Sequence, residues 1–435
     1  MINDTIVALA TPPGKAGIGI VRVSGDKSKQ IIQGITSCNT DFLPRYMYLK
    51  DIYLDNITDK GLVVYFQAPN SFTGEDIAEI QCHGGYFVVK AVIDKCLQLG
   101  ARMAEPGEFS KRAFLNGKIT IDQAEGIIDL INAESEAQAK SGSVLLQGKL
   151  FDIIKAIQDK LTDILAEIEA KLDYPEYEYT DVENIEVLNR LNQVKQELNL
   201  LLSTKVNGVK IKNGVKIAIV GAPNAGKSSL LNALTNTNKS IVTDIAGTTR
   251  DIVEAEYVYN GILFRLFDTA GIRESKDVVE QIGIQRAIES IQQADLVLKL
   301  IDTTNPVEVD TEDKQTITVY NKSDLKTVNH KNENSIEISA QQGTNIEKLK
   351  QLIFDNTIVG GYNSSQFYLS NSRHIQYVEQ AINSLNNAIS NFNSTTLDFV
   401  ASDIKDCWQY LGEISGINSN ERIIDRVFEK FCLGK

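Results

Sequence analysis

The sequence predicts a multidomain protein that combines α/β and all-α parts, with a doubly wound α/β domain inserted into a helical domain. Three observations predict this architecture. Short apolar runs separated by turn signals occupy residues 1–118, apolar residues at helical spacing follow, and strand and helix patterns then alternate between residues 212 and 360. Helical patterns return after that point. Because 435 residues exceed what one hydrophobic core accommodates, several domains are expected.

The changes of pattern divide the chain into four segments. We expect an N-terminal domain at 1–118, a first helical part at 119–211, the inserted α/β domain at 212–360 and a second helical part at 361–435. The two helical parts then form one domain that the α/β domain interrupts.

Composition narrows the class of protein. The net charge is −13, whereas a protein that holds nucleic acid by itself usually carries a basic surface, so an RNA substrate would need a local basic patch or a partner. No apolar run reaches the roughly 18 residues that span a bilayer, and the first residues lack a secretory signal, so we expect a cytoplasmic protein. The five cysteines show no metal-ligand spacing, and most are expected to be small buried residues.

The N-terminal segment has the pattern of a small α/β domain. Apolar periodicity predicts a helix at 91–99, and stretches rich in proline and glycine at 11–14 and 68–74 predict loops. Apolar runs bounded by turns predict strands at 6–10, 19–23, 61–66 and 77–82.

Two amphipathic stripes predict a pair of long antiparallel helices in the central part. The first stripe stops at Tyr174-Pro175, where proline cannot continue a helix. Its apolar positions are Leu150, Ile154, Ile157, Leu161, Ile164, Ile168 and Leu172, and those of the second stripe are Leu188, Leu191, Val194, Leu198 and Leu201.

A phosphate-binding loop is predicted at the start of the α/β domain. Gly221, Gly226, Lys227 and Ser228 follow the apolar strand 215–220 and precede a helix, which is the context that this motif requires. Glycines let backbone N–H groups approach phosphate oxygens, and the helix N-terminus adds positive potential. Lys227 is expected to reach the β- and γ-phosphates, and the Ser228 hydroxyl to bind Mg²⁺.

Two further segments supply candidate metal and phosphate contacts. The DTAG segment at 268–271 ends an apolar strand, so Asp268 is expected in the Mg²⁺ shell and the Gly271 N–H at the γ-phosphate. Thr249, in the GTTRD segment at 247–251, is a candidate second hydroxyl ligand of Mg²⁺.

The segment NKSD indicates that the base is guanine. Asp324 can accept hydrogen bonds from the N1–H and 2-amino groups of guanine, and adenine offers neither donor there. Asn321 and Lys322 would brace the base, and the N–H of Ala340 would meet the guanine O6. Because these segments occur in the required order, each at a strand end, the sequence predicts a GTPase.

The residue that orients the attacking water is not evident from the motifs. Many GTPases carry glutamine directly after the DTAG-type turn, but Ile272 occupies that position and cannot do the same task. Glu280, Arg250 and Arg273 are the nearby candidates, and the residues alone do not choose among them.

The chain resembles the MnmE (TrmE) family of bacterial and organellar tRNA-modification GTPases. The likeness covers essentially the whole chain. It is carried by the GTPase motifs with the loop form GAPNAGKS and GTTRD, and by DTIVALATPPGKAGIGIVRVSG, SFTGEDIAEIQCHGG, EPGEFSKRAFLNGKITIDQAEGIIDLI and the terminal CLGK.

This resemblance implies an N-terminal α+β domain with a folate-binding-like fold that forms a homodimer, a helical domain, and an inserted Ras-like P-loop GTPase domain. It implies a K⁺-stimulated GTPase acting with a flavin-dependent partner of the MnmG (GidA) family, in a heterotetramer or larger complex whose FAD is bound by the partner. The reaction would add an aminomethyl or carboxymethylaminomethyl group to carbon 5 of the wobble uridine of certain tRNAs. A 5-formyl- or methylene-tetrahydrofolate would supply the one-carbon unit.

The resemblance also assigns residues outside the nucleotide motifs. It places tetrahydrofolate contacts at Arg22, Glu79, Lys118 and Lys435, whose cations and carboxylate suit the glutamate tail and the pterin amine of that ligand. Cys432 matches the functional cysteine of the family, and its chemical role stays open.

For hydrolysis, the resemblance implies a K⁺ ion that offsets charge developing between the β- and γ-phosphates. Glu280 matches the glutamate that positions water, which would solve the problem posed by Ile272. Arg250 and Arg273 match arginines of lesser or switch-related importance. The implied K⁺ ligands are the side chain of Asn224 and the backbone carbonyls of Thr243, Ile245 and Thr248.

The complete nucleotide site expected from motifs and resemblance combines the phosphate loop, the loop before GTTRD, the DTAG turn and the guanine loops. Its residues are Asn224, Ala225, Gly226, Lys227, Ser228, Ser229, Thr243, Asp244, Ile245, Ala246, Gly247, Thr248, Thr249, Asp268, Thr269, Ala270, Gly271, Asn321, Lys322, Asp324, Ser339 and Ala340.

Two other functions remain as alternatives. A regulatory or ribosome-assembly GTPase would share the nucleotide motifs but would not bind folate. A membrane-associated GTPase could use the amphipathic stripes, but these lack the basic polar faces expected of membrane-surface helices.

Overall fold

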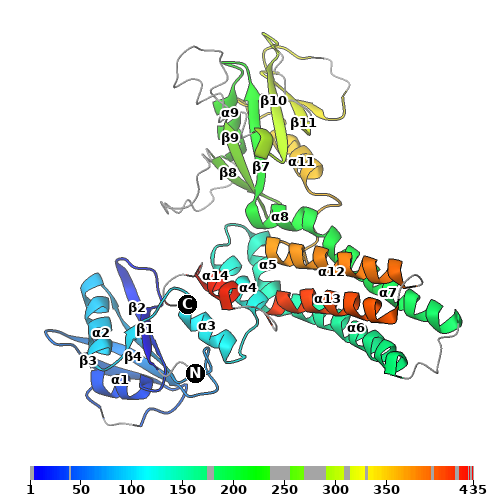
Figure 1. Cartoon of the computed structure of the whole chain (residues 1–435). Coiled ribbons are helices and arrows are strands. Elements are labelled where there is room, and N and C mark those ends of the chain that lie inside the picture. Colours follow the sequence, from blue (N-terminus) through cyan, green and yellow to red (C-terminus); the bar gives the residue numbers. More distant parts are fainter. Residues whose placement is uncertain are drawn as a thin grey trace, which may run out of the picture. The chain divides into compact units, whose positions relative to one another are not determined.

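The computed structural model describes most of the chain (Figure 1). Contacts within the chain divide it into two compact units. Unit 1 comprises residues 1–128, 145–159 and 408–435, and unit 2 comprises 129–144 and 160–407. The described residues exclude 1–3, 39–40, 174–180, 236–254, 269–290, 308–313, 329–331, 393–395, 417–420, 430, 432–433 and 435, together with the side chains of 181–183, 268 and 421–423.

Unit 1 is built on a six-stranded sheet in the order β3-β4-β5-β2-β1-β6. Neighbouring strands run antiparallel, except that β6 pairs parallel with β1. The strands are β1 (Ile6–Leu9), β2 (Ala16–Ser24), β3 (Met47–Tyr53), β4 (Thr58–Phe66), β5 (Ile77–Gly84) and β6 (Arg102–Met103), and the accompanying helices are α1 (Ser28–Ile35), α2 (Tyr86–Gln98) and α3 (Glu108–Leu115).

Apolar residues cover both faces of this sheet. Because successive strand residues point to opposite sides, neighbouring residues of β1 belong to different cores. Val7 lies in the core that α1 and α2 share with the sheet. Its neighbours Ile6 and Ala8 pack instead with Ala104 and with Phe109 of α3. The predicted small α/β domain is therefore confirmed, with α3 covering the face opposite α1 and α2.

The strands predicted in the N-terminal segment are confirmed as β1, β2, β4 and β5, and the predicted helix as the second half of α2. Strand β3 was not predicted. It is an edge strand on which Met47, Leu49 and Tyr53 are exposed. Apolar residues on the solvent face remove the alternation by which a half-buried strand is recognised.

The helical elements follow the predicted stripes closely. All predicted apolar positions of α6 are buried from Leu150 to Ile168, and Leu172 is half-buried near its end at Asp173. In α7 the stripe begins at Val187 and not at the predicted Leu188, which is half-buried. The helices are α4 (Ile121–Ile131), α5 (Glu136–Leu146), α6 (Lys149–Asp173), α7 (Asp181–Ser203), α8 (Lys205–Asn213), α12 (Ser372–Asn391), α13 (Leu397–Ser415) and α14 (Glu421–Phe428).

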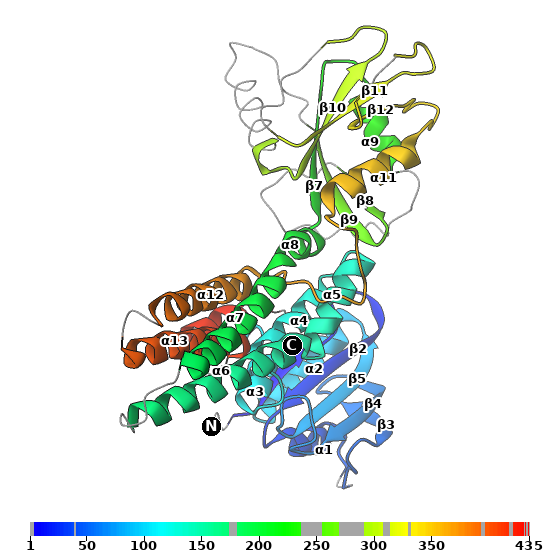
Figure 2. The same cartoon turned by 90° about the vertical axis from the view of Figure 1, so that its right-hand side faces the viewer.

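Two ion pairs show that α6 and α7 are antiparallel, as predicted. Lys160 lies 2.6 Å from Glu197, and further along α6 Glu167 pairs with Arg190, which comes earlier in α7. Helix α12 packs along α7 (Figures 1 and 2). Helices from before and after the α/β domain thus pack together, which is the arrangement expected when that domain is an insertion.

The α/β domain contains a second six-stranded sheet, in the order β12-β11-β10-β7-β9-β8. Its strands pair in parallel, except that β8 is antiparallel to β9. Its elements are β7 (Val215–Gly221), α9 (Lys227–Thr235), β8 (Ala255–Tyr259), β9 (Ile262–Asp268), β10 (Leu296–Asp302), β11 (Thr316–Asn321), β12 (Ser335–Glu337) and α11 (Ile346–Thr357).

Apolar cores lie on both faces of this sheet. Ile217 and Ile219 of β7 belong to the larger core, whereas the alternating residues Ala218 and Val220 pack with Ile291 on the other face. The predicted doubly wound, Ras-like architecture is therefore confirmed. Parallel pairing also brings the carboxyl ends of β7, β9, β10 and β11 to one edge, where ligands bind in this class of fold.

Within the described residues, none of the helices is both long enough and apolar enough to cross a membrane.

Candidate functional site

The predicted phosphate loop connects β7 to α9. Strand β7 ends at Gly221 and α9 begins at Lys227, so the loop precedes a helix N-terminus as the motif requires. Asn224 and Gly226 have φ values of 64° and 96°, in the left-handed region. A Cβ atom at Gly226 would lie 2.3 Å from Asn321 Nδ2, so glycine is required there. Lys227 Nζ lies 3.0 Å from Gly221 O, which turns the ammonium over the loop.

Asn321 joins the phosphate loop to the guanine loops. Its Nδ2 donates to Ala225 O at 2.9 Å, and its Oδ1 accepts from the Ala340 N–H at 3.0 Å. The side chain is only 2% exposed. The structure thus brings the phosphate loop to two segments that follow it by about a hundred residues or more, as the motif order predicted.

Lys322 is held by a carboxylate and a hydroxyl that sequence reasoning missed. Its Nζ lies 2.6 Å from Asp302 Oδ2, and its carbonyl accepts from Thr303 Oγ1 at 3.0 Å. Burial alone would raise the pKa of Asp302, but hydrogen bonds from Lys322 and Thr304 outweigh that effect and lower the pKa to about 2. The signal in the sequence was a pair of polar residues directly after the apolar run of β10, at the carboxyl edge of the sheet.

The other described motif residues lie around this edge. Ser228 and Ser229 are exposed in the first turn of α9, and Asp324 is exposed after β11. Ser339 is 1% exposed, and its backbone pairs with Thr344 in an isolated bridge beside Ala340. Exposed hydroxyls and a carboxylate at the edge where the parallel strands end suit a ligand that carries phosphates and a polar base.

Several predicted residues lie outside the described residues, including the candidates for catalysis and most of the K⁺ ligands. Asp268 ends β9, but its side chain is among those not described. The predicted residues outside the description are Thr243, Asp244, Ile245, Ala246, Gly247, Thr248, Thr249, Arg250, Thr269, Ala270, Gly271, Arg273, Glu280, Cys432 and Lys435.

In unit 1, Arg22 and Glu79 form a pair on adjacent strands. They face each other in the register of β2 and β5, and Arg22 Nε donates to Glu79 Oε1 at 3.0 Å. The guanidinium lies 5.8 Å from the ring centroids of both Phe72 and Phe109. Arg22 Nη1 also approaches Gly434 O at 3.5 Å. The structure therefore brings two of the predicted folate residues together with the C-terminal segment.

Gly434 is fitted closely against β1. A Cβ at this position would lie 2.1 Å from Leu9 O, and its φ of 93° is left-handed. Only glycine satisfies both conditions. The penultimate residue of the CLGK segment is thus built into unit 1.

The third described folate candidate, Lys118, contacts the loop that also carries Phe72. Its Nζ donates to Pro69 O at 3.0 Å, and its alkyl chain packs against Gly74. Loop 68–74, predicted from its sequence, therefore lies next to both Arg22 and Lys118.

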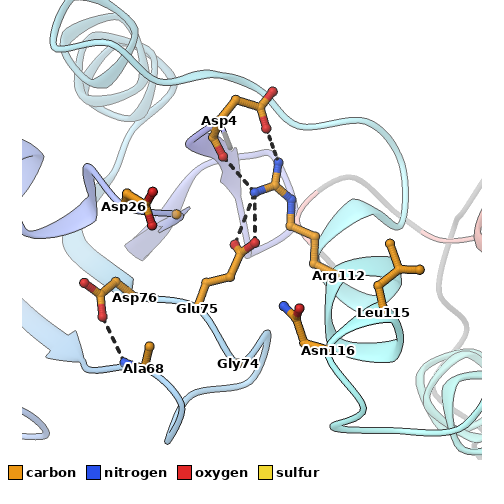
Figure 3. Close-up of a pocket in the computed structure, with 10 residues that line it drawn as sticks. Asp4, Asp26, Ala68, Gly74, Glu75, Asp76, Arg112, Leu115 and Asn116 are labelled. Atoms are coloured by element: carbon orange, nitrogen blue, oxygen red, sulfur yellow. Dashed lines mark hydrogen bonds and ion pairs between the residues drawn. The ribbon is translucent and has the colours of Figure 1, made fainter. Parts of the chain in front are cut away.

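The same loop borders a cavity of about 580 Å³ in unit 1 (Figure 3). Arg112, only 2% exposed, points among its carboxylates. Its Nη2 lies 2.7 Å from Asp4 Oδ1 and 2.9 Å from Glu108 Oε1, and its Nη1 lies 3.1 Å from Glu75 Oε2. Burial alone would raise the pKa of Glu108, but hydrogen bonds led by that from Arg102 outweigh burial and lower it.

Two family descriptions match the chain. The description "MnmE helical domain" matches residues 121–432, and "GTP-binding protein TrmE N-terminus" matches residues 5–118. The first range includes the inserted α/β domain, and together the two cover nearly the whole sequence.

Curated relatives match from end to end. A protein of Acetivibrio thermocellus named "tRNA modification GTPase MnmE" is 40% identical over 456 residues, which cover 100% of this chain and 99% of the relative. Proteins of the same name from Clostridioides difficile and Thermotoga maritima are each 39% identical and cover at least 99% of both chains.

Solved structures match part of the chain. Era from Aquifex aeolicus, bound to GDP and AlF4−, is 27% identical with a TM-score of 0.26, and the match covers 39% of this chain and 65% of that chain. The assignment of the chain to a family depends on the sequence relatives and not on this structural likeness. Since their identity extends through the N-terminal domain, the helices and the GTPase motifs alike, the chain belongs to the MnmE family and is a GTP hydrolase.

Proposed function

We propose that this chain is a K⁺-stimulated GTPase that modifies the wobble uridine of certain tRNAs. It would act with a flavin-dependent partner of the MnmG family and take a one-carbon unit from tetrahydrofolate. The observation that carries the proposal is the end-to-end identity with relatives named "tRNA modification GTPase MnmE". That identity includes the N-terminal domain, which a GTPase with a purely regulatory role would not need.

In the nucleotide site, the backbone of the phosphate loop and Lys227 would hold the phosphates. Gly226 lets the loop approach Asn321, because a Cβ there would lie 2.3 Å from Asn321 Nδ2. Asp324 would recognise guanine. The Ala340 N–H already donates to Asn321 Oδ1, so it would have to be shared between Asn321 and the O6 atom of guanine. These residues bind and orient GTP before any chemical step.

The chain would hold two cations. Ser228, exposed at the start of α9, together with Thr249 and Asp268, is a donor set suited to Mg²⁺, which prefers hydroxyl and carboxylate oxygens. Asn224, exposed and in a left-handed conformation, together with the carbonyls of Thr243, Ile245 and Thr248, would hold K⁺. The cations supply positive charge to the phosphate oxygens as negative charge develops there.

The chain would supply the remaining groups for hydrolysis from the segments before β8 and after β9. Glu280 would orient the attacking water. Arg250 and Arg273 would have a lesser role in hydrolysis or a role in the switch between nucleotide states. Cys432, in the C-terminal segment, would act in the modification reaction.

For folate, Arg22, Glu79 and Lys118 would contact the ligand, with Lys435 following Gly434 into the same region. Support comes from the Arg22–Glu79 pair and the closely fitted Gly434. The two aromatic rings near the Arg22 guanidinium also suit a flat ligand.

The guanine assignment is tested by calorimetry with Mg²⁺ present. We expect GDP and GTP to bind and ATP not to bind measurably. Asp324→Asn should weaken GTP binding and favour xanthosine triphosphate, whose 2-oxo group accepts from an amide. Equal affinity for ATP and GTP, or an unaltered GTP affinity in Asp324→Asn, would contradict the assignment.

The K⁺ proposal is tested by turnover in KCl and NaCl at equal ionic strength. We expect faster hydrolysis in KCl and loss of that difference in Asn224→Ala. Glu280→Ala should slow hydrolysis while GTP affinity stays unchanged. Equal rates in the two salts would refute the K⁺ site, and a loss of affinity as large as the loss of rate would refute the role of Glu280.

The folate proposal is tested by titration with 5-formyl-tetrahydrofolate. Arg22→Gln should weaken binding by roughly tenfold or more, because a charge-assisted hydrogen bond is lost. Arg45→Gln is a matched control, since Arg45 contacts the same loop through Asn70 O but not Glu79. If the wild-type protein does not bind the folate, a regulatory or ribosome-assembly GTPase becomes the better assignment.

The modification itself is tested by nucleoside analysis. In tRNA from a strain that lacks this chain, the substituent at carbon 5 of the wobble uridine should be missing, and it should return when the wild-type chain is supplied. An unchanged wobble uridine would refute the proposed function.

A further inference from the structure

Two residues at the carboxyl end of β10 contact the segment that carries the guanine-binding candidates. Asp302 is the last residue of β10 and lies opposite Asn321, the last residue of β11. Thr303 follows and is only 1% exposed. Both lie outside the nucleotide-binding motifs recognised in the sequence.

Thr303 holds the main chain of this segment at two successive carbonyls. Its N–H donates to Asn321 O at 3.1 Å, and its Oγ1 donates to Lys322 O at 3.0 Å. Lys322 has a φ of 64°, in the left-handed region that a lysine rarely adopts. The hydroxyl of Thr303 therefore stabilises a backbone conformation that Lys322 would not keep by itself.

Asp302 holds the side chain of the same lysine. Lys322 Nζ lies 2.6 Å from Asp302 Oδ2, while Asp302 Oδ1 accepts from the N–H and Oγ1 of Thr304 at 2.8 and 2.6 Å. The contacts with Thr304 orient the carboxylate independently of the lysine. Because the Asp302 side chain is only 13% exposed, the pair is partly shielded from water and its hydrogen bond is charge-assisted.

The guanine segment is fixed from the other side as well. Ser323 N–H donates to Ile338 O at 3.1 Å, and Asn321 is bonded to the phosphate loop. Between these anchors, the orientation of Lys322 sets where Asp324 points, since only one residue separates them. The contacts from β10 are the ones that act on Lys322 itself.

We propose that Asp302 and Thr303 are positioning residues of the guanine site. They hold Lys322 turned so that its alkyl chain and the Asp324 carboxylate meet the base without rearrangement. The inference rests on the proposed GTP site and adds two residues to it. A preformed loop costs less ordering entropy on binding. It also distinguishes guanine from hypoxanthine, because Asp324 must lie where the 2-amino group arrives.

The test compares GDP with IDP, which lacks the 2-amino group, by calorimetry on the full chain with Mg²⁺. Thr303→Val removes the hydroxyl at nearly constant volume and should raise the Kd for GDP by roughly threefold to tenfold. The Kd for IDP should rise less, so the preference for GDP over IDP falls. Asp302→Asn should act in the same direction, and Thr303→Ser, which keeps the hydroxyl, should bind GDP within about twofold of wild type.

Matched controls lie at the opposite ends of the same strands. Thr316 Oγ1 donates to Lys314 O at the start of β11, and Asp295 accepts from the Lys216 N–H just before β10. Thr316→Val and Asp295→Asn therefore remove similar contacts far from the base, and they should leave the ratio of GDP to IDP affinity unchanged.

Three results would overturn the inference: an unaltered GDP affinity in Thr303→Val and Asp302→Asn, an equal loss for GDP and IDP, or the same change of ratio in the controls. An equal loss would show a merely structural role, which does not discriminate between bases. A wild-type protein that binds no GDP would instead refute the proposed GTP site, so the two failures are distinguishable.

Discussion

Replacing Asn321 with alanine would remove the side chain that joins three segments of the nucleotide site. Its amide donates to Ala225 O and accepts from the Ala340 N–H, at 2.9 and 3.0 Å. Ala225 is 1% exposed and Ala340 is 8% exposed. Asn321→Ala therefore leaves one backbone carbonyl and one N–H buried without these partners.

The size of the effect follows from the cost of unpaired buried groups. Each costs about 1–3 kcal/mol, so the two together cost about 2–6 kcal/mol. A water molecule in the space left by the amide would recover part of this, and we therefore expect a loss of about 2–4 kcal/mol. That corresponds to roughly 30-fold to 1,000-fold in the equilibrium between the closed and open arrangements of the loops.

Hydrogen exchange measures this equilibrium without requiring the whole chain to unfold in one step. The peptide that contains Ala340 should exchange faster in Asn321→Ala by up to that factor, in protein without nucleotide. The affinity for GDP should fall by at most the same factor, because binding requires the closed arrangement and weakens only as the open arrangement becomes populated. Strands on the far side of the sheet should exchange at the wild-type rate.

Asn334→Ala is the matched control, because Asn334 is exposed in the loop before β12. It should change neither the exchange of the Ala340 peptide nor the GDP affinity. If that peptide exchanges at the wild-type rate in Asn321→Ala, the amide of Asn321 does not hold the loops together, and the reasoning fails.

Three further predictions concern unit 1. The pKa values of Asp4 and Glu108 are lower in the folded protein than their ordinary values of 3.8 and 4.5. Their ion pairs should thus stabilise unit 1 fully above about pH 5, and thermal unfolding at falling pH should show this contribution lost below pH 4.5; a flat profile there would contradict it. Burial raises the pKa of Cys96 to about 12, so its thiol should resist maleimide at pH 8 until the protein is denatured, and rapid labelling of native protein would refute its burial. Gly434→Ala would place a Cβ 2.1 Å from a carbonyl of β1 and should weaken the binding of 5-formyl-tetrahydrofolate. Gly17→Ala is the control, because the space at its Cβ position is open and binding should not change. Equal binding by both variants would show that Gly434 does not help to form the folate site.

The arrangement of the phosphate loop was predictable because its motif is local. Lys227 Nζ reaches Gly221 O six residues earlier, and the left-handed Gly226 lies within the same turn. A short motif therefore encodes most of its own geometry. The order of the motifs along the chain then predicted a shared edge, because parallel strands place their carboxyl ends together.

The residues that were missed act across the sheet. Asp302 and Thr303 follow an ordinary buried strand, and their role appears only because β10 pairs with β11 in the register that places Asp302 opposite Asn321. The first apolar position predicted for α7 was wrong for a related reason, although the other four are buried as predicted. Burial of Val187, and not Leu188, depends on which helices pack against α7, and both residues are apolar.

By itself, the sequence determined four strands of unit 1, the alternation of strands and helices in the α/β domain, the phosphate loop and the amphipathic faces of the long helices, because these depend on hydrogen bonds and periodicities within one or two turns. Only the tertiary structure decided that Arg22 meets Glu79 and the C-terminal Gly434, and that Asn321 lies between Ala225 and Ala340. Those contacts depend on strand order and register, which are set by how whole faces bury their apolar area and not by any local stretch of residues.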